Sequence, residues 1–135
     1  MSNSDYKKFL DILITETKAK KFKWDYLDKN ENLVRNMGWY STPLFPTMSI
    51  EKKCPVFNTD DSFYAKSGNT YIVIYVHDND PASLYVIPYT FKKTVHLSAD
   101  EYGHLITRLH NIVQSQFPSA DQFIKDFIFD EVEEI

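Results

Sequence analysis

Six consecutive apolar residues, Tyr71 to Val76, limit the folds open to this chain. β-Branched and aromatic residues make up the run, which indicates a strand, and a strand that is apolar at every position needs cover on both faces. Similar runs at Ser62–Ala65 and Leu84–Phe91 flank it across short polar gaps. The pattern predicts a three-stranded antiparallel meander in which Thr70–His77 is central. Pro88 cannot donate to a strand ladder, so the third run is expected at an edge or a bulge.

The two ends of the chain show helical periodicity. Ser4 can cap a first helix that ends near Ala19. Ser98 and Glu101 form a capping box, in which the Ser98 hydroxyl accepts from the third helical N–H. The helix predicted after Ser98 has an apolar stripe of six residues at helical spacing: Tyr102, Leu105, Ile106, Leu109, Ile112 and Val113.

The capping signal is repeated at Ser119, ahead of a final helix. Four large apolar residues of that helix are expected to face inward: Phe123, Ile124, Phe127 and Ile128. Both C-terminal helices are therefore predicted to pack on the sheet. Gly103 lies inside the first of them, where glycine lowers stability, so it predicts close packing against a strand or a partner.

Residues 22–58 give weaker signals. Phe22, Trp24 and Tyr26 alternate with charged residues, which predicts a short half-buried strand, and Leu33–Met37 can form a helical turn. Beyond that turn the chain is interrupted by three prolines, Pro43, Pro46 and Pro55. Residues 39–58 are therefore expected to form an ordered, aromatic-rich loop with short strand pieces.

These elements predict an α+β fold in the order N-terminal helix, short strand, aromatic and Pro-rich loop, three-stranded meander, helix, helix. Hydrophobic residues are 43% and charged residues 25% of the chain, which is typical of globular proteins and argues against disorder. We expect one globular domain over residues 1–135. The sheet face opposite the helices needs its own cover, either the Pro-rich loop or a second copy of the chain.

The charge balance bears on the choice of partner. The chain has 15 Lys/Arg against 19 Asp/Glu, and residues 67–135 hold only 4 basic residues against 10 acidic ones. This acidic excess disfavours nucleic acid. A small basic cluster contains Lys18, Lys20, Lys21 and Lys23. It could contact phosphate, but a solvated helix end whose lysines complement the helix dipole is the favoured interpretation.

Cys54 is the only cysteine, so an intramolecular disulfide and a cysteine-rich zinc site are both excluded. The N-terminal residues lack the pattern of a signal peptide, and no apolar run is long enough to span a membrane. We therefore expect a cytoplasmic protein without a membrane partner.

No known catalytic motif is present, and 3 glycines cannot build a glycine-rich phosphate cradle. The sequence predicts no catalytic residue, no cofactor and no metal. The string His77-Asp78-Asn79-Asp80 is the most metal-like, but ordinary turn chemistry ahead of Pro81 is favoured. Cys54 could act as a nucleophile, yet its apolar neighbours favour a small core residue.

One polar row lies on the helix that follows Ser98, opposite its apolar stripe. It consists of Glu101, His104, Arg108 and Asn111. Such a row could bind an anion or exchange protons, because histidine titrates near neutrality. A solvated helix face is the favoured interpretation.

Four stretches carry a resemblance that spans most of the chain: residues 22–27 (FKWDYL), 61–65 (DSFYA), 84–88 (LYVIP) and 107–119 (TRLHNIVQSQFPS). In these stretches the chain resembles a group of small, uncharacterised proteins of Gram-positive bacteria. The resemblance implies a cytoplasmic bacterial protein and is compatible with an origin on a mobile element. It supplies no activity and no catalytic residues.

The first hypothesis is therefore a non-enzymatic interaction protein that binds itself, as a homodimer, or another protein. An immunity or inhibitor protein of a mobile element, covering a basic partner, is one form of it. The candidate surface is aromatic and poor in charge, as interface cores are: Trp39, Tyr40, Leu44, Phe45, Tyr85 and Tyr89.

The alternative is a small-ligand-binding protein or an enzyme without a known motif. Its pocket would use tyrosines together with His77, His96, His104 or Cys54. Convergence of two or more of these side chains in one concave site, with shifted pKa values, would discriminate between the two hypotheses.

Overall fold

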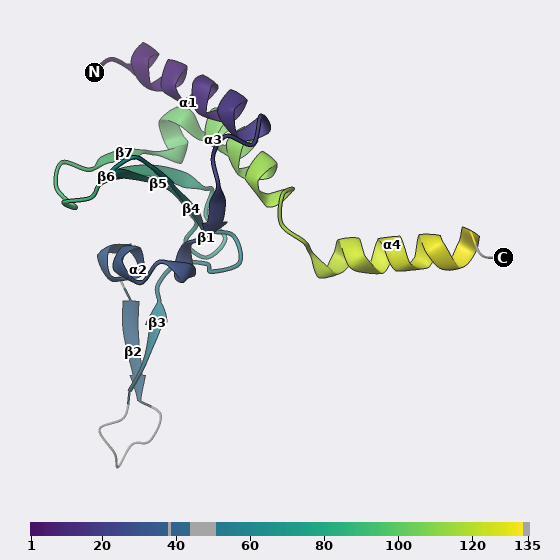
Figure 1. The fold of residues 1–135 in the computed structure, drawn as a ribbon. Helices are drawn as coiled ribbons and strands as arrows, with labels where there is room; N and C mark the ends of the chain where they lie inside the picture. The colour runs from purple at the N-terminus through teal and green to yellow at the C-terminus, as the bar shows by residue number, and fades with distance from the viewer. Residues whose placement is uncertain (38, 44–50, 134–135) are drawn as a thin grey trace.

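The computed structural model describes residues 1–37, 39–43 and 51–133, and describes side chains over residues 1–37 and 56–130. The elements follow one another along the chain, and Figure 1 shows how they are arranged. They are the helix α1 (Asn3–Lys18), strand β1 (Trp24–Tyr26), the 3₁₀ helix η1 (Leu27–Lys29), helix α2 (Glu31–Met37), strands β2 (Trp39–Pro43), β3 (Glu51–Pro55), β4 (Phe63–Ser67), β5 (Thr70–Tyr75), β6 (Ser83–Pro88) and β7 (Val95–Leu97), and helices α3 (Ala99–Gln114) and α4 (Ala120–Glu133).

The main sheet is antiparallel and has five strands in the order β1-β4-β5-β6-β7. The predicted meander is its centre: β4, β5 and β6 pair in sequence, and β5 is the middle strand. Ile72 and Ile74 of β5 face one side of the sheet and Val73 faces the other, which explains why the run is apolar at every position.

The sheet has more strands than the three-stranded meander that was predicted, because two short strands extend it. Trp24–Tyr26 pairs with Ala65–Phe63 across a long sequence separation, and Val95–Leu97 pairs with Val86–Leu84. The alternation of Phe22, Trp24 and Tyr26 did predict β1 as a strand, but a distant pairing leaves no local signal of its partner. The three residues of β7 are too few to show a period. Pro88 ends β6 beyond the residues that β7 contacts, so it interrupts no ladder on that side.

Residues 39–43 and 51–55 form a separate antiparallel pair, in which Trp39 lies opposite Pro55 and Tyr40 opposite Cys54. The strand pieces predicted in this stretch are present. Residues 44–50, which the prediction also covered, lie outside the described residues.

One face of the sheet is covered by α1 and α3, which lie side by side in Figure 1. The Tyr102 hydroxyl donates to Asn3 Oδ1 at 2.6 Å, and Gln116 Nε2 donates to the Thr17 carbonyl at 3.2 Å, so the helices run in the same direction. The predicted α3 stripe faces this core: Tyr102, Ile106, Leu109 and Val113 are buried, and Leu105 and Ile112 are half-buried.

The opposite face has a second, smaller core. Leu27 of η1 and Leu33 and Val34 of α2 pack there on Val73 and Ile87 of the sheet, together with Phe57. The cover expected from residues 39–58 is thus supplied in part by Phe57. Among the described residues, the short segment that connects β1 to β2 also contributes to this cover, through Leu27, Leu33 and Val34.

The prediction that α4 packs on the sheet was wrong. All its described side chains, residues 120–130, are exposed, and Figure 1 shows the helix projecting from the body. The helical period of the sequence is correct, but the rest of this chain supplies no surface, among its described residues, that covers the apolar face.

Two capping predictions also need correction. The first helix is capped by Ser2 rather than Ser4, with a reciprocal capping box to Asp5. The α3 helix does begin after Ser98, but the Ser98 side chain makes no capping hydrogen bond. Ser119 does accept from the Gln122 N–H, at 3.1 Å, as expected.

Gly103 is not explained by close packing. Among the described residues, a Cβ added there would meet only the Ala99 side chain, at 3.8 Å, an ordinary contact. We therefore expect Gly103→Ala to raise the free energy of unfolding by about 0.5–1 kcal/mol, because alanine loses less backbone entropy in a helix. Urea denaturation measures the change, and destabilisation would contradict the open surroundings of Gly103.

Gly68 is the matched control. It occupies the two-residue loop between β4 and β5 with a φ of 58°, and it also has open space around its Cα. Alanine is disfavoured at this φ whatever the space, so Gly68→Ala should lower stability by about 1 kcal/mol.

Candidate functional site

The predicted aromatic interaction surface is only partly described. Tyr85 is half-buried on the sheet face that carries the smaller core, whereas Tyr89 is 64% exposed just beyond β6. Trp39 and Tyr40 lie on β2, but their side chains, like Leu44 and Phe45 altogether, lie outside the described residues. β6 is not a free edge over Leu84–Val86, because β7 pairs with it there.

The predicted polar row does lie on one helix, but it builds no site. Glu101, His104, Arg108 and Asn111 are all exposed on α3. No hydrogen bond or ion pair joins these four described side chains to one another. The row has the features of a solvated helix face.

His110, a neighbour of that row, has a structural partner. Its Nε2 donates to the Asp61 carbonyl at 2.7 Å, and Gln114 Nε2 donates to Asp61 Oδ1 at 3.0 Å. Asn58 Nδ2 donates to the other carboxylate oxygen, also at 3.0 Å. These bonds fix the turn before β4 against α3, and they occupy the polar groups involved.

The His77 turn is open to solvent. His77 Nδ1 lies 3.6 Å from an oxygen of Asp78 and 3.7 Å from one of Asp80, and all three side chains are at least half exposed. Within the described parts of the chain, no three histidine, cysteine or acidic residues are grouped closely enough to hold a metal ion. Cys54 lies on β3, and its side chain is outside the description.

Two of the histidines named for the alternative hypothesis do converge. A groove of about 190 Å³ between the ends of β5, β6 and β7 and the start of α3 is lined by Tyr75, His77, Asp80, Tyr85, His96 and Ser98, among others. The His96 ring stacks on Tyr85, with centroids 4.3 Å apart, and Tyr75 meets Tyr85 edge-on at 5.7 Å.

Two phenols in this groove have shifted pKa values. Burial raises the pKa of Tyr85 above its usual value, and burial together with the neighbouring Tyr85 does the same to the pKa of Tyr75. The two hydroxyls therefore stay protonated to a higher pH than an exposed tyrosine does. The groove is nevertheless smaller than most ligand sites, which measure roughly 300–1,000 Å³, and both imidazoles are exposed.

The tyrosine pKa shifts predict alkaline destabilisation. The unfolded chain releases these protons near pH 10, whereas the folded chain holds them to higher pH, so their contribution is complete below about pH 10 and is lost as pH rises through the folded pKa values. Urea denaturation between pH 8 and 11.5 should show a smaller loss of stability in Tyr75→Phe/Tyr85→Phe than in the wild type. The exposed Tyr89→Phe is the control, and equal slopes in wild type and double variant would contradict the prediction.

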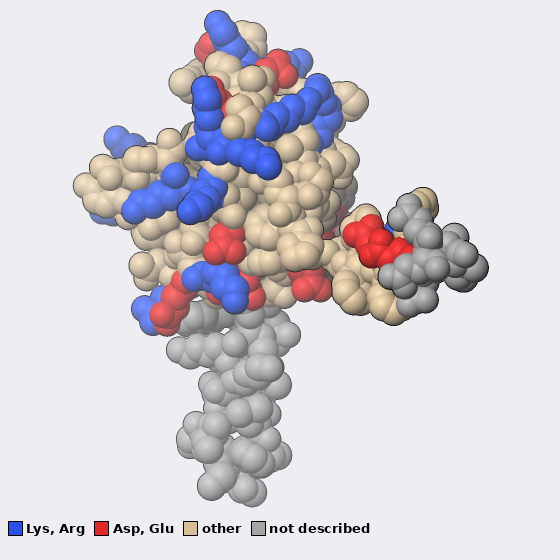
Figure 2. Space-filling view, turned by 45° about the vertical axis from the view of Figure 1, so that its right-hand side comes forward, with Lys and Arg blue, Asp and Glu red and all other residues tan. Residues whose placement is uncertain are grey.

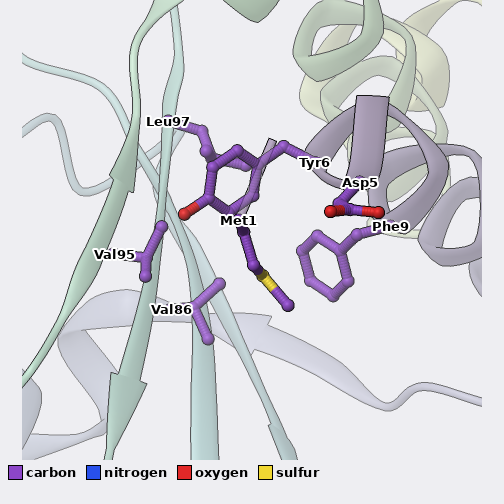
Figure 3. Close-up of a pocket in the computed structure, with 7 residues that line it drawn as sticks. All are labelled: Met1, Asp5, Tyr6, Phe9, Val86, Val95 and Leu97. Carbon is purple, nitrogen blue, oxygen red and sulfur yellow. The ribbon is translucent and has the colours of Figure 1, made fainter. Parts of the chain in front are cut away.

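A second concavity is almost wholly apolar. Figure 3 shows Met1, Tyr6 and Phe9 at the start of α1 facing Val86, Val95 and Leu97 of β6 and β7, around a volume of about 240 Å³. The carboxylate at its rim, Asp5, is already engaged by Ser2. With so few free polar groups to orient a ligand, this pocket is best explained as loose packing at the edge of the core.

The most unusual surface is the apolar face of α4, whose side chains the sequence predicted to be buried. Phe123, Ile124, Phe127 and Ile128 form one face of α4 and are 53–69% exposed; we call them the α4 stripe. The rings of Phe123 and Phe127 stack with centroids 6.2 Å apart. Phe129 is 68% exposed and points to the opposite side of the helix.

A basic groove lies on the body where α3 ends, next to the root of α4. Its volume is about 780 Å³. Three lysines, Lys18, Lys20 and Lys23, and three apolar residues, Phe22, Ile112 and Phe117, contribute to its lining. We call it the lysine groove. Figure 2 shows Lys and Arg side chains gathered over the upper body and acidic side chains on the projecting helix.

No protein-family model matches the chain, and no solved structure matches it. In the described parts of the chain, no helix has the length and apolarity needed to cross a membrane.

Proposed function

We propose that this protein is a non-enzymatic interaction protein that binds another polypeptide through the α4 stripe. The observation that carries the proposal is the exposure of the four stripe side chains on a single helix. Exposed apolar patches of this kind in soluble proteins mark interaction sites.

The helix itself supports this proposal. A helix of 14 residues is marginal in water, and Phe and Ile are not strong helix formers. The stability of α4 therefore depends on burial of the α4 stripe against another surface. An amphipathic helix that presents anchors at i, i+1, i+4 and i+5 suits a partner with an apolar groove.

Charge defines the partner further. Over Ala120–Glu133 the helix has five acidic residues against one lysine, Lys125. Asp126 and Asp130 follow Phe123 and Phe127 by three positions and so border the stripe. The partner that fits is an apolar groove with a basic rim. An immunity or inhibitor protein of a mobile element, acting in the cytoplasm, is a role compatible with this chemistry.

The His/Tyr groove supports the alternative less well. It brings together two histidines and two tyrosines, but its volume is small and its imidazoles face solvent. The α4 stripe is the larger unexplained feature, so a binding role is favoured over catalysis.

We expect Phe127→Gln to weaken binding of the partner by roughly 10–100-fold, because a central aromatic anchor is removed while a good helix former takes its place. The measurement is affinity capture from a Gram-positive lysate that also contains a differently tagged copy of this chain. Phe129→Gln is the matched control, since it changes a phenylalanine that is at least as exposed as Phe127 but lies on the other side of the helix. Equal capture by the two variants, or no captured protein with the wild type, would contradict the proposal.

A further inference from the structure

The lysine groove is complementary to α4 in both polarity and charge. Its apolar lining, from Phe22, Ile112 and Phe117, could cover the α4 stripe, and Lys18, Lys20 and Lys23 could face the acidic border of that helix. Opposite charges that meet across an interface favour the correct partner and the correct register.

The same chain therefore carries both halves of one interface. In this structure the α4 stripe and the lysine groove do not meet: every side chain of α4 from residue 120 to residue 130 is exposed. The short linker at Pro118 carries the helix away from the body. A helix that leaves its own body, while a complementary groove lies open at its root, is the arrangement from which two copies exchange an element.

We propose that two copies of this chain form a symmetric dimer by exchanging α4, with each α4 stripe lying in the lysine groove of the other copy. This inference rests on the proposed function, and it identifies the partner polypeptide as a second copy of the same chain. The groove lies at the root of α4, so a two-fold axis would make the two helices pass each other antiparallel over about 21 Å.

The area is adequate for a stable dimer. Covering the exposed part of four large apolar side chains on each helix, together with the exposed lining of each groove, removes on the order of 1,000–1,500 Å² from solvent. That area reaches the lower part of the range for specific interfaces, which is roughly 1,200–2,000 Å². Antiparallel exchange would also place Asp126 and Asp130 of each α4 beside the lysines of the other copy.

Charge reversal tests the exchange. One variant carries Lys18→Glu, Lys20→Glu and Lys23→Glu, and the other carries Asp126→Lys and Asp130→Lys. In each variant alone, the groove side chains and the side chains that border the stripe have the same sign, so each variant should be monomeric. Mixed together, the two variants should form a heterodimer, because each groove then meets a stripe border of opposite sign.

The measurement is light scattering coupled to size exclusion over a concentration range of about 1–200 µM, which spans the affinities expected of such an interface. The wild type should have about twice the chain mass of 15.9 kDa, and each charge variant should raise the dissociation constant by roughly 30-fold or more. The control is Lys7→Glu/Lys8→Glu/Lys92→Glu, which changes the charge equally at exposed positions away from the groove and should leave the dimer intact. Circular dichroism checks that every variant is folded.

Two results would overturn the exchange: a monomeric wild type at every concentration, or a dimer that withstands reversal of the groove lysines. If the wild type is monomeric, slow exchange of the α4 amides with solvent would mean that α4 folds back on its own groove. The wild type can be monomeric and still capture a lysate protein that the Phe127→Gln variant does not capture. In that case the identification of the partner as a second copy is wrong and the proposed function stands.

Discussion

Phe63→Ala should lower the free energy of unfolding by about 3–5 kcal/mol, the usual cost of removing a fully buried phenylalanine. Phe63 is 1% exposed and lies at the start of β4. Its ring packs on Tyr26 at 5.2 Å and on Phe117 at 5.0 Å between centroids, and it meets His110 edge-on. The substitution therefore leaves a cavity where β1, β4 and the end of α3 meet.

Thermal and urea denaturation would measure this loss, and the midpoint of thermal unfolding should fall by roughly 10–20 °C. Phe129→Ala is the matched control, because it removes the same atoms from a side chain that is 68% exposed and should change stability by less than about 0.5 kcal/mol. A loss below about 1 kcal/mol for Phe63→Ala would show that the ring cluster is not packed as described.

Trp24→Ala should have a comparable effect, a loss of about 3–5 kcal/mol. Trp24 is 6% exposed on the edge strand β1, and its indole Nε1 donates to the buried Thr17 hydroxyl at 3.2 Å. The side chain thus joins the end of α1 to the sheet and also lines the lysine groove. We therefore expect the variant to lose stability and α4 binding together.

Thr17→Val separates the hydrogen bond from the packing. It keeps the side-chain volume but leaves the indole N–H without its acceptor, so a loss of about 1–3 kcal/mol is expected. Trp24→Phe removes the donor, and combining it with Thr17→Val should cost less than the sum of the two single changes. Strict additivity in this cycle, measured by urea denaturation, would contradict the contact between Trp24 and Thr17.

The elements with a strong local period were predictable. The apolar stripe from Tyr102 to Val113 predicted that α3 packs on the sheet, and the unbroken apolar run from Tyr71 to Val76 predicted that β5 is the central strand. Both predictions are confirmed. In both cases the spacing of apolar residues reports which faces must be buried, and this information lies within one element.

Other features depended on residues far apart in the chain. The pairing of β1 with β4 and the three-residue strand β7 leave no periodic signal. Ser98 has the sequence of a capping box, but its hydroxyl makes no capping bond, because a capping sequence permits that bond and the local geometry decides whether it forms.

The candidate site was predictable only in its parts. The sequence indicated an amphipathic helix at residues 120–133 and a lysine cluster near residue 20, but it did not relate them. The lysine groove exists because Gln116 and Phe117 lie beside the end of α1, as the bond from Gln116 to the Thr17 carbonyl shows. That proximity spans 99 positions of sequence.

The sequence by itself determined which segments are helices and central strands and which of their faces are apolar, because hydrophobic periodicity is a property of neighbouring residues. Only the tertiary structure decided what each face meets. It put α3 against the sheet and left α4 exposed, although both helices have apolar stripes of similar spacing. The physical reason is that burial of a face depends on which distant surface reaches it, and a local pattern contains no information about that surface.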